Sequence, residues 1–244
     1  MSHKVTAGPR AIDSGPVTRD GCPVDLYLRL PYLGEVELIS AEIPNGASVL
    51  EMGCGVGRVT KQLLAKGYYV TAIDNSPEML AHVPPAATTI CSNIEDLELK
   101  ASFDAVLLAS NLINVADDGL RTAQLKACRR HVKAGGRLLF ERYDPTWLST
   151  VEVGRIGTIG GDIELFADEV CRRGTKVQIC FRYEGPPGRW LQHSTVSVLD
   201  DEAVAACLSS GGFSNVWWIN RTWGAAAGVD DAPRSVRCAS SRTR

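Results

Sequence analysis

The feature that most constrains this chain is a glycine-rich turn after an apolar run, VLEMGCGVGRVT over residues 49–60. A strand that enters a helix through glycines lets the backbone approach a ligand, because no Cβ intrudes, and the first helical amides point at that ligand. The dinucleotide fingerprint requires its third glycine at position 58, where this chain has Arg58, and no Gly-Lys-Ser/Thr ending of a phosphate loop follows. The spacing therefore predicts a ligand that lies across the turn without a pyrophosphate.

Strand-like and helix-like segments alternate around this turn, from residue 48 to residue 144. Five runs are almost continuously apolar: SVLEM, YYVTAID, ATTIC, FDAVLLAS and GRLLFERY. Between them we expect helices, one (PEMLAHV) beginning at Ser76 and Pro77, and another over residues 120–132 that is closed by the glycine pair at 135 and 136. Strands that are apolar along their whole length are typical of a parallel sheet covered on both faces, so the pattern predicts an α/β core.

The segments that flank this core differ from it in composition. Residues 1–22 are rich in Gly, Pro, Ser and Thr and predict a flexible arm, whereas residues 23–47 predict a cap of two short helices separated at Pro31. Residues 145–199 contain DIELFADEVC, TKVQICFRYE and RWLQHSTVSVLD, which predict an antiparallel meander. Residues 200–244 predict a helix, the strand FSNVWWIN and a last strand at RSVRCAS that complete the first sheet.

The overall composition excludes several classes of function. The chain has 26 basic and 28 acidic residues, so we expect no charge-driven binding of nucleic acid. Its 8 cysteines are scattered without metal-ligand spacing, which indicates no metal site and a reducing compartment. No apolar run reaches the length of about 18 residues that a membrane helix needs, so we expect a soluble, cytoplasmic protein without a membrane partner.

Asp74 adds a second constraint on the ligand. It stands at the end of YYVTAID, 21 residues after Gly53. A carboxylate at the tip of the second strand accepts hydrogen bonds from the two hydroxyls of a ribose. The alternative is that Asp74 caps the helix that begins near Ser76.

Five segments of the chain resemble the motifs of a known family and occur in the same order. VLEMGCGVGR, AIDNSPEML, CSNIEDL, FDAVLLAS and GGRLLFE resemble successive motifs of class I S-adenosylmethionine-dependent methyltransferases, over about residues 45–143. The resemblance implies a Rossmann-like seven-stranded sheet with its last strand antiparallel, helices on both faces, and an antiparallel β insertion after the fifth strand. It implies S-adenosylmethionine as the cofactor and S-adenosylhomocysteine as the product. The ligand would lie over the carboxyl ends of strands one, two and four, as is general for open α/β sheets.

The resemblance also assigns cofactor contacts to positions of this chain. The glycine turn would line the methionine part, Asp74 would bind the ribose, and the residues after the third and fourth strands would flank the adenine and the amino acid. Tyr27 matches an aromatic cap over the cofactor, with a half-buried core tyrosine as the alternative. The full set is Tyr27, Glu51, Gly53, Cys54, Gly55, Asp74, Asn75, Met79, Asn93, Ile94, Ala109 and Asn111.

Residues on the acceptor side are expected beyond the fourth and fifth strands and in the meander. Methyl transfer from a sulfonium requires alignment and exclusion of water, with a base only where the nucleophile carries a proton. The candidate catalytic residues are Glu141, Asp168 and His193, and the candidate substrate contacts are Asn114, Tyr143, Trp147, Phe166, Arg182 and Trp190. The alternative for Glu141 is a structural acid paired with an arginine, and the alternative for His193 is a structural histidine on its strand.

The aromatic second half favours a flat organic acceptor. It resembles bacterial small-molecule methyltransferases of natural-product pathways, and the N-terminal segment and ERYDPTW are similar to indole C3-methyltransferases of physostigmine-type pyrroloindoline biosynthesis. That resemblance implies attack by the indole C3 carbon and an acid or histidine beside the ring nitrogen. The alternatives are an N- or O-methyltransferase of another secondary metabolite, an RNA or protein methyltransferase, an NAD-dependent oxidoreductase and a non-catalytic S-adenosylmethionine-binding protein. The oligomeric state is not determined by the sequence.

Overall fold

The computed structural model describes residues 15–186 and 188–228, which form two β-sheets and the helices around them. A seven-stranded sheet has the order β10-β11-β5-β4-β1-β2-β3, and a four-stranded sheet has the order β6-β7-β8-β9. In the large sheet, β11 runs antiparallel to both of its neighbours, β5 and β10, while β1 to β5 are parallel. The predicted α/β, Rossmann-like fold with its antiparallel insertion is confirmed.

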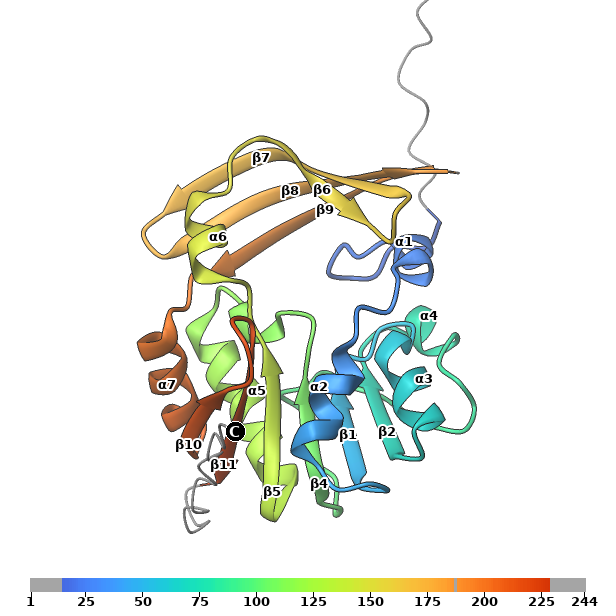
Figure 1. Ribbon diagram of the computed structural model, residues 1–244, viewed down its shortest axis with the longest axis vertical. Coiled ribbons are helices and arrows are strands. Elements are labelled where there is room, and N and C mark those ends of the chain that lie inside the picture. The colour runs from blue at the N-terminus through green and yellow to red at the C-terminus, as the bar shows by residue number, and fades with distance from the viewer. Residues whose placement is uncertain (1–14, 187, 229–244) are drawn as a thin grey trace, which may run out of the picture.

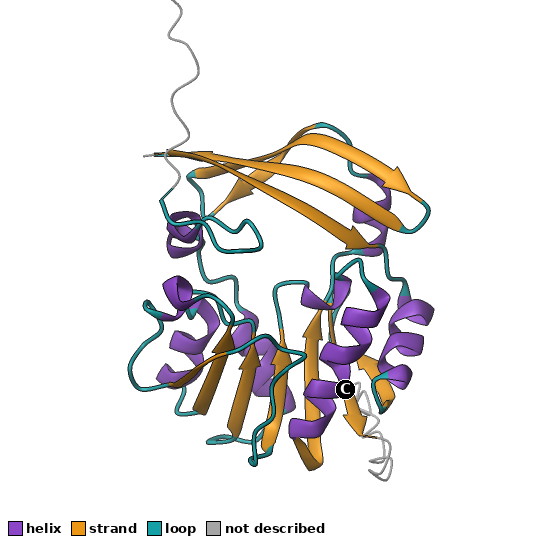
Figure 2. Ribbon diagram, turned by 180° about the vertical axis from the view of Figure 1, so that it is seen from behind, coloured by secondary structure: helices purple, strands orange, loops and turns teal. Residues whose placement is uncertain are grey.

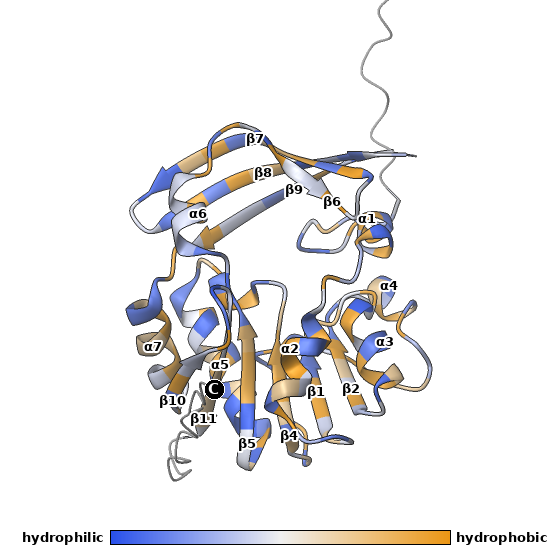
Figure 3. Cartoon of the chain, viewed as in Figure 1, coloured by the Kyte–Doolittle hydropathy of each residue, from blue (hydrophilic) through white to orange (hydrophobic). Residues whose placement is uncertain are grey.

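The large sheet combines strands from both ends of the chain. Its strands are β1 (Ser48–Met52), β2 (Tyr69–Asp74), β3 (Thr88–Cys91), β4 (Phe103–Leu108), β5 (Val132–Glu141), β10 (Phe213–Trp218) and β11 (Trp223–Gly228). Figure 3 shows that β1, β2 and β4 are largely hydrophobic, as expected for strands covered on both faces.

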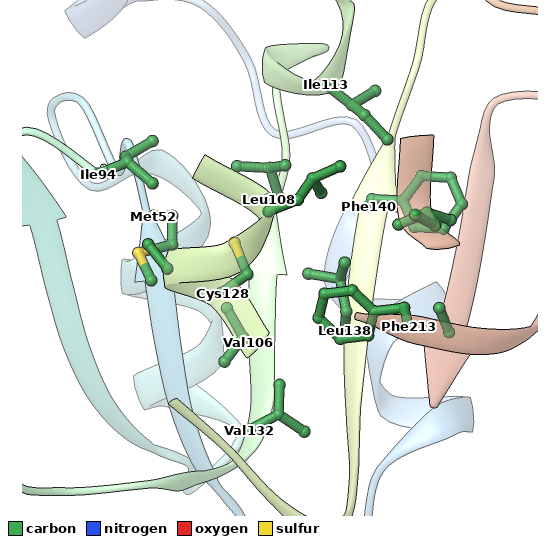
Figure 4. Close-up of a cluster of buried hydrophobic side chains, with 14 of the residues drawn as sticks. Met52, Ile94, Val106, Leu108, Ile113, Cys128, Val132, Leu138, Phe140 and Phe213 are labelled. Carbon is green, nitrogen blue, oxygen red and sulfur yellow. The ribbon is translucent and has the colours of Figure 1, made fainter. Parts of the chain in front are cut away.

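Helices pack on both faces of this sheet (Figures 1 and 2). On one face α2 (Glu35–Glu42) and α3 (Arg58–Ala65) bury Ile39 and Leu63, and on the other α5 (Asp118–His131) and α7 (Asp201–Ser210) bury Cys128 and Leu208. The second core also contains Phe140 from β5 (Figure 4). No helix in the described part of the chain is long and apolar enough to cross a membrane.

The small sheet lies across the end of the large sheet toward which β1, β4 and β5 point (Figure 1). Its strands are β6 (Gly154–Ile159), β7 (Ile163–Arg173), β8 (Lys176–Gly185) and β9 (Gly188–Ser197), and α6 (Pro145–Thr150) leads into it. The face that carries Ile179 and Phe181 packs against Leu148 of α6 and is called the inner face. The N-terminal helix α1 (Val24–Arg29) lies beside this sheet.

Several element boundaries differ from the sequence-based prediction. The helix over residues 120–132 ends at His131, and β5 begins at once at Val132, because Val132 pairs with Phe103 of β4 and extends the strand through the glycine pair. The helix predicted for PEMLAHV is one turn, α4 (Pro77–Leu80), with a serine N-cap as expected. The strand β6 and the helix α6 were not predicted.

The predicted and the described elements also differ near the two ends of the chain. The last described strand is β11, which the sequence pattern missed because its small residues, WGAAAG, lack alternation. The strand predicted at RSVRCAS, residues 234–240, lies outside the described residues, as does most of the predicted flexible arm. Residues 15–22 lead into a short antiparallel bridge between Val17 and Pro23.

The buried side chain of Asn114 joins the two sheets. It lies in the short helix η1 (Leu112–Asn114) after β4 and is fully buried. Its Nδ2 donates to the carbonyl of Ser197 at the end of β9, 2.8 Å away, and its Oδ1 accepts from the amide of Tyr143 after β5, 3.0 Å away. A neighbouring bridge between Val115 and Val196 makes the same connection through the backbone.

We expect Asn114→Leu to lower the free energy of unfolding by about 2–4 kcal/mol, because it removes two hydrogen bonds and leaves a buried carbonyl and amide unpaired. Urea unfolding followed by circular dichroism measures this. Gln178→Leu, on an exposed position of β8, is the control and should change stability by less than about 0.5 kcal/mol. Equal effects of the two substitutions would show that the amide does not join the sheets.

Candidate functional site

The glycine turn between β1 and α3 is closely packed at its first glycine. Gly53 has φ 69°, and a Cβ there would lie 2.5 Å from Cδ1 of Leu112 in η1. Gly55 has φ 55°, and the nearest atom to a Cβ there is Cδ1 of the Tyr27 ring, 3.9 Å away. The turn therefore brings backbone close to η1 on one side and faces an aromatic ring from the N-terminal segment on the other.

Asp74 is linked to the glycine turn through its side chain. Its Oδ2 accepts from the amide of Gly55, 2.8 Å away, and its Oδ1 accepts from the amide of Ser76, 2.9 Å away. Burial raises the pKa of this carboxyl, against the effect of the amide hydrogen bonds, which lower it. Each carboxylate oxygen has a second lone pair, so Asp74 can hold the turn and still accept a ribose hydroxyl. The residues present fit the ribose and amino-acid parts of S-adenosylmethionine.

Glu51 is buried beneath the same turn. Its side chain is 3 % exposed, and its Oε2 accepts from the hydroxyl of Thr60 in α3, 2.5 Å away. Burial raises the pKa of Glu51 to about 7, although the Thr60 hydrogen bond and the charge of Arg58 lower it. Glu51 therefore connects β1 to α3 and supports the geometry of the turn.

The residues expected around adenine lie together at the ends of β2 and β3. Asn75 donates through Nδ2 to Oδ1 of Asn93, 3.1 Å away. Met79 and Ile94 are buried, and the Cδ1 atom of Ile94 lies 3.8 Å from a Cβ position on Gly53. The structure thus brings these four residues to the same edge of the sheet as Asp74.

The turn after β4 has an unusual backbone that Glu141 holds in place. Ala109 is buried, and the next two residues, Ser110 and Asn111, have φ of 54° and 59°. Left-handed non-glycine residues cost of the order of 1–3 kcal/mol each and persist only where the surroundings enforce them. The amide of Ser110 donates to Oε2 of Glu141 at the end of β5, 2.7 Å away. Burial raises the pKa of Glu141, and the Ser110 hydrogen bond opposes this shift.

Aromatic side chains from the insertion lie near this edge. Tyr143 stacks on Trp147, with ring centroids 5.7 Å apart and an interplanar angle of 26°. Burial, together with the nearby charge of Glu141, raises the pKa of Tyr143 to about 12. Burial and the proximity of Tyr143 raise the pKa of Tyr183 on the inner face of the small sheet. Both phenols are therefore neutral at physiological pH, and we call Tyr143, Trp147 and Tyr183 the aromatic wall.

Four predicted residues lie on the opposite, outer face of the small sheet, which is a correction to the sequence-based prediction. Asp168 binds Arg182 at 2.8 Å, and Arg182 lies 4.0 Å from the Phe166 ring centroid. His193 is exposed and lies 3.8 Å from Cys180. Successive residues of a strand point to opposite faces, so Arg182 and His193 face away from Phe181 and Gln192. Asp168 and His193 are thereby separated from Glu141.

Two further predicted contacts are buried. Asn114 has both polar groups paired inside the protein, so its role here is structural. Trp190 lies on the inner face and is 1 % exposed, with the guanidinium of Arg29 from α1 5.9 Å from its ring centroid. Sequence reasoning missed Tyr183, Gln192 and Cys22. Period-2 alternation could have grouped Tyr183 with Phe181, but only the strand register decides which face is inward.

The comparison with known families agrees with this geometry. Residues 49–136, which include most of β1, all of β2 to β4 and the glycine turn, match the family described as a methyltransferase domain. Over these residues the chain is similar to methyltransferase domains. This match supports S-adenosylmethionine as the cofactor and methyl transfer as the activity, and it argues against a nicotinamide-dependent oxidoreductase.

Two curated relatives of this chain share one name. The ubiquinone biosynthesis O-methyltransferase of Xanthomonas axonopodis pv. citri is 35 % identical over 121 residues, which cover 46 % of this chain and 49 % of that protein. The protein of the same name from Xylella fastidiosa is 29 % identical over 175 residues, covering 68 % and 67 %. The chain thus spans about half the length of the first of these relatives.

Solved structures share the fold of this chain. The CcbJ methyltransferase of Streptomyces caelestis is 16 % identical with a TM-score of 0.67, covering 83 % of this chain and 94 % of that one. The sugar N-methyltransferase KedS8 of Streptoalloteichus is 17 % identical with a TM-score of 0.64, covering 93 % and 99 %. At these identities the likeness shows the fold alone, and it does not show the indole C3 activity that the sequence resemblance implied.

We expect Asp74→Asn to weaken binding of S-adenosylhomocysteine at least tenfold, because hydrogen bonds to an ionised carboxylate are worth about 1.5–3 kcal/mol. Titration calorimetry with S-adenosylhomocysteine, and separately with NAD, measures this and tests the rival cofactor. Glu98→Gln, an exposed acid beyond β3, is the matched control and should bind normally. Unchanged affinity in Asp74→Asn, or tight NAD binding, would contradict the assignment.

Glu51→Gln should change how stability depends on pH. The folded-state pKa of Glu51, about 7, is above its ordinary value of 4.5, so the folded protein binds this proton more tightly than the unfolded chain. This group therefore lowers the free energy of unfolding as pH rises from about 5 to about 8, and the glutamine removes that loss. Urea unfolding at both ends of this range measures it. A constant difference between variant and parent across the range would contradict the raised pKa.

Proposed function

We propose that the protein transfers a methyl group from S-adenosylmethionine to a small aromatic acceptor, with Glu141 as the proton acceptor. The observation that carries this proposal is the position of Glu141. Its carboxyl lies at the carboxyl end of β5, has a pKa raised by burial, and is close enough to Tyr143 to raise the pKa of that phenol.

The cofactor side of the proposal uses the residues already described. Asp74 and the glycine turn would hold the ribose and amino acid, and Tyr27 would cover the turn. When bound, S-adenosylmethionine supplies a methyl group on a positively charged sulfonium, a good leaving group. The protein then has to align the nucleophile, exclude water and accept the nucleophile's proton.

The aromatic wall favours a flat acceptor. Tyr143, Trp147 and Tyr183 offer ring faces, and the two tyrosines offer neutral hydroxyls, which suit stacking and hydrogen bonding to an aromatic acceptor. Glu141 is the predicted catalytic residue that lies beside this wall, because Asp168 and His193 are on the outer face. A carboxylate there can take the proton of a phenol hydroxyl, and the curated relatives named above are O-methyltransferases by name.

Indole remains an acceptor to be tested beside phenols. Attack by indole C3 places positive charge on the ring nitrogen, and Glu141 is the group that could stabilise it. A mass-spectrometric screen for the gain of one methyl group over phenols, indoles and aromatic amines distinguishes them. We expect phenols to be methylated. Turnover of only aliphatic amines or sugars would overturn the proposal for an aromatic acceptor.

With an acceptor from that screen, Glu141→Gln should lower kcat by about 10²–10⁴-fold, the range for loss of a general base. The amide oxygen can still accept from Ser110, so S-adenosylhomocysteine affinity should stay within about threefold. In the parent, kcat/KM should rise with pH through the raised pKa of Glu141, because the ionised form is the base, and the variant should lose this rise. His193→Ala is the control with parental kcat. A kcat of Glu141→Gln equal to that of the control would exclude Glu141 as the base.

A further inference from the structure

A hydrogen-bonded network connects the small sheet to the tyrosine over the glycine turn. Gln192 of β9 donates through Nε2 to the hydroxyl of Tyr27, 3.1 Å away, and lies 3.4 Å from Sγ of Cys22. The Tyr27 hydroxyl lies 3.5 Å from the same sulfur. On its other side, Oε1 of Gln192 accepts from the hydroxyl of Tyr183, 3.5 Å away. The network thus runs from the aromatic wall to the N-terminal segment.

The polarity of the Gln192 amide determines the direction of these bonds. Its NH₂ group only donates and its carbonyl only accepts, so the Tyr27 hydroxyl accepts from Gln192 and directs its own proton toward Cys22. Burial raises the pKa of Tyr27, so this phenol is neutral. The strand register pairs Gln192 with Phe181, which places its side chain on the inner face.

Tyr27 depends on this network because its helix is short. The helix α1 has 6 residues and no side-chain N-cap, and Leu28 beside Tyr27 is 48 % exposed. A helix of this length has little stability of its own, so tertiary contacts hold it. Leu26 is fully buried and anchors the helix, but the ring that covers Gly55 belongs to Tyr27. The shortest hydrogen bond of the Tyr27 hydroxyl is the one that it accepts from Gln192, at 3.1 Å.

We propose that Gln192 is a positioning residue that holds Tyr27 over the cofactor and couples the acceptor wall to the cofactor site. An acceptor in contact with Tyr183 orders the Gln192 amide, and the amide orders Tyr27. The two ligands therefore bind more tightly together than separately. The acceptor half of this inference rests on the proposed function, whereas the cofactor half rests on the glycine turn and needs no knowledge of the acceptor.

The test is a double-mutant cycle on cofactor affinity with Gln192→Leu, Tyr27→Phe and the combination. We expect Gln192→Leu to weaken S-adenosylhomocysteine binding by about tenfold in titration calorimetry, because it leaves the Tyr27 hydroxyl without its donor. The double variant should bind no more weakly than Gln192→Leu, since both changes remove the same hydrogen bond. His193→Leu, the next residue of β9 on the outer face, should bind like the parent.

Normal binding by Gln192→Leu, or fully additive effects in the cycle, would overturn the positioning role. Thermal unfolding of each variant separates loss of fold from loss of affinity, and Gln192→Met, nearly the same shape without the donor, replaces the leucine if that variant does not fold. With an acceptor that is turned over, Gln192→Leu should raise the KM for S-adenosylmethionine more than it lowers kcat. The calorimetric cycle measures only cofactor affinity and needs no acceptor. Its result therefore stands even if the acceptor is not aromatic, and failure of one proposal is distinguishable from failure of the other.

Discussion

The buried carboxamide of Asn114 holds the two sheets in a single arrangement, and the functional site depends on that arrangement. Its hydrogen bonds reach the exits of both β5 and β9, so the ends of these strands cannot move independently. A buried amide has a strong preference for satisfied partners, because each unpaired polar group costs about 1–3 kcal/mol. The aromatic wall and Glu141 consequently keep a defined position relative to the glycine turn.

The turn after β4 lies between the cofactor side and the acceptor side. Ser110 and Asn111 have strained left-handed backbones, and the Glu141 carboxylate accepts the Ser110 amide that this backbone presents. Leu112, directly after it, packs against Gly53. One short segment therefore touches both the glycine turn and the acid proposed as base. Strain concentrated at such a junction is common where function requires a particular backbone geometry.

The cofactor half of the site was largely predictable, and the acceptor half was not. Gly53, Asp74 and Ile94 follow strands of a parallel sheet, so their order in the sequence and the rule for carboxyl ends suffice to bring them together. Phe166, Arg182 and His193 were expected at the site from their strand context and proved to face outward. A shift of one residue in a strand exchanges its two faces, and no local pattern in these mixed strands decided between them.

The amino-acid sequence by itself determined the α/β core and the glycine turn with Asp74, because these depend on local periodicity and on contacts between consecutive elements. The class of cofactor followed from the resemblance of its motifs to class I methyltransferases. Only the tertiary structure decided that Tyr27 meets Gln192 across 165 residues and that Glu141 stands apart from Asp168 and His193. It also showed that the side chain of Asn114 connects the two sheets by hydrogen bonds. These facts depend on strand register, bulges and long-range packing, which the sequence encodes only through the energy of the whole folded chain.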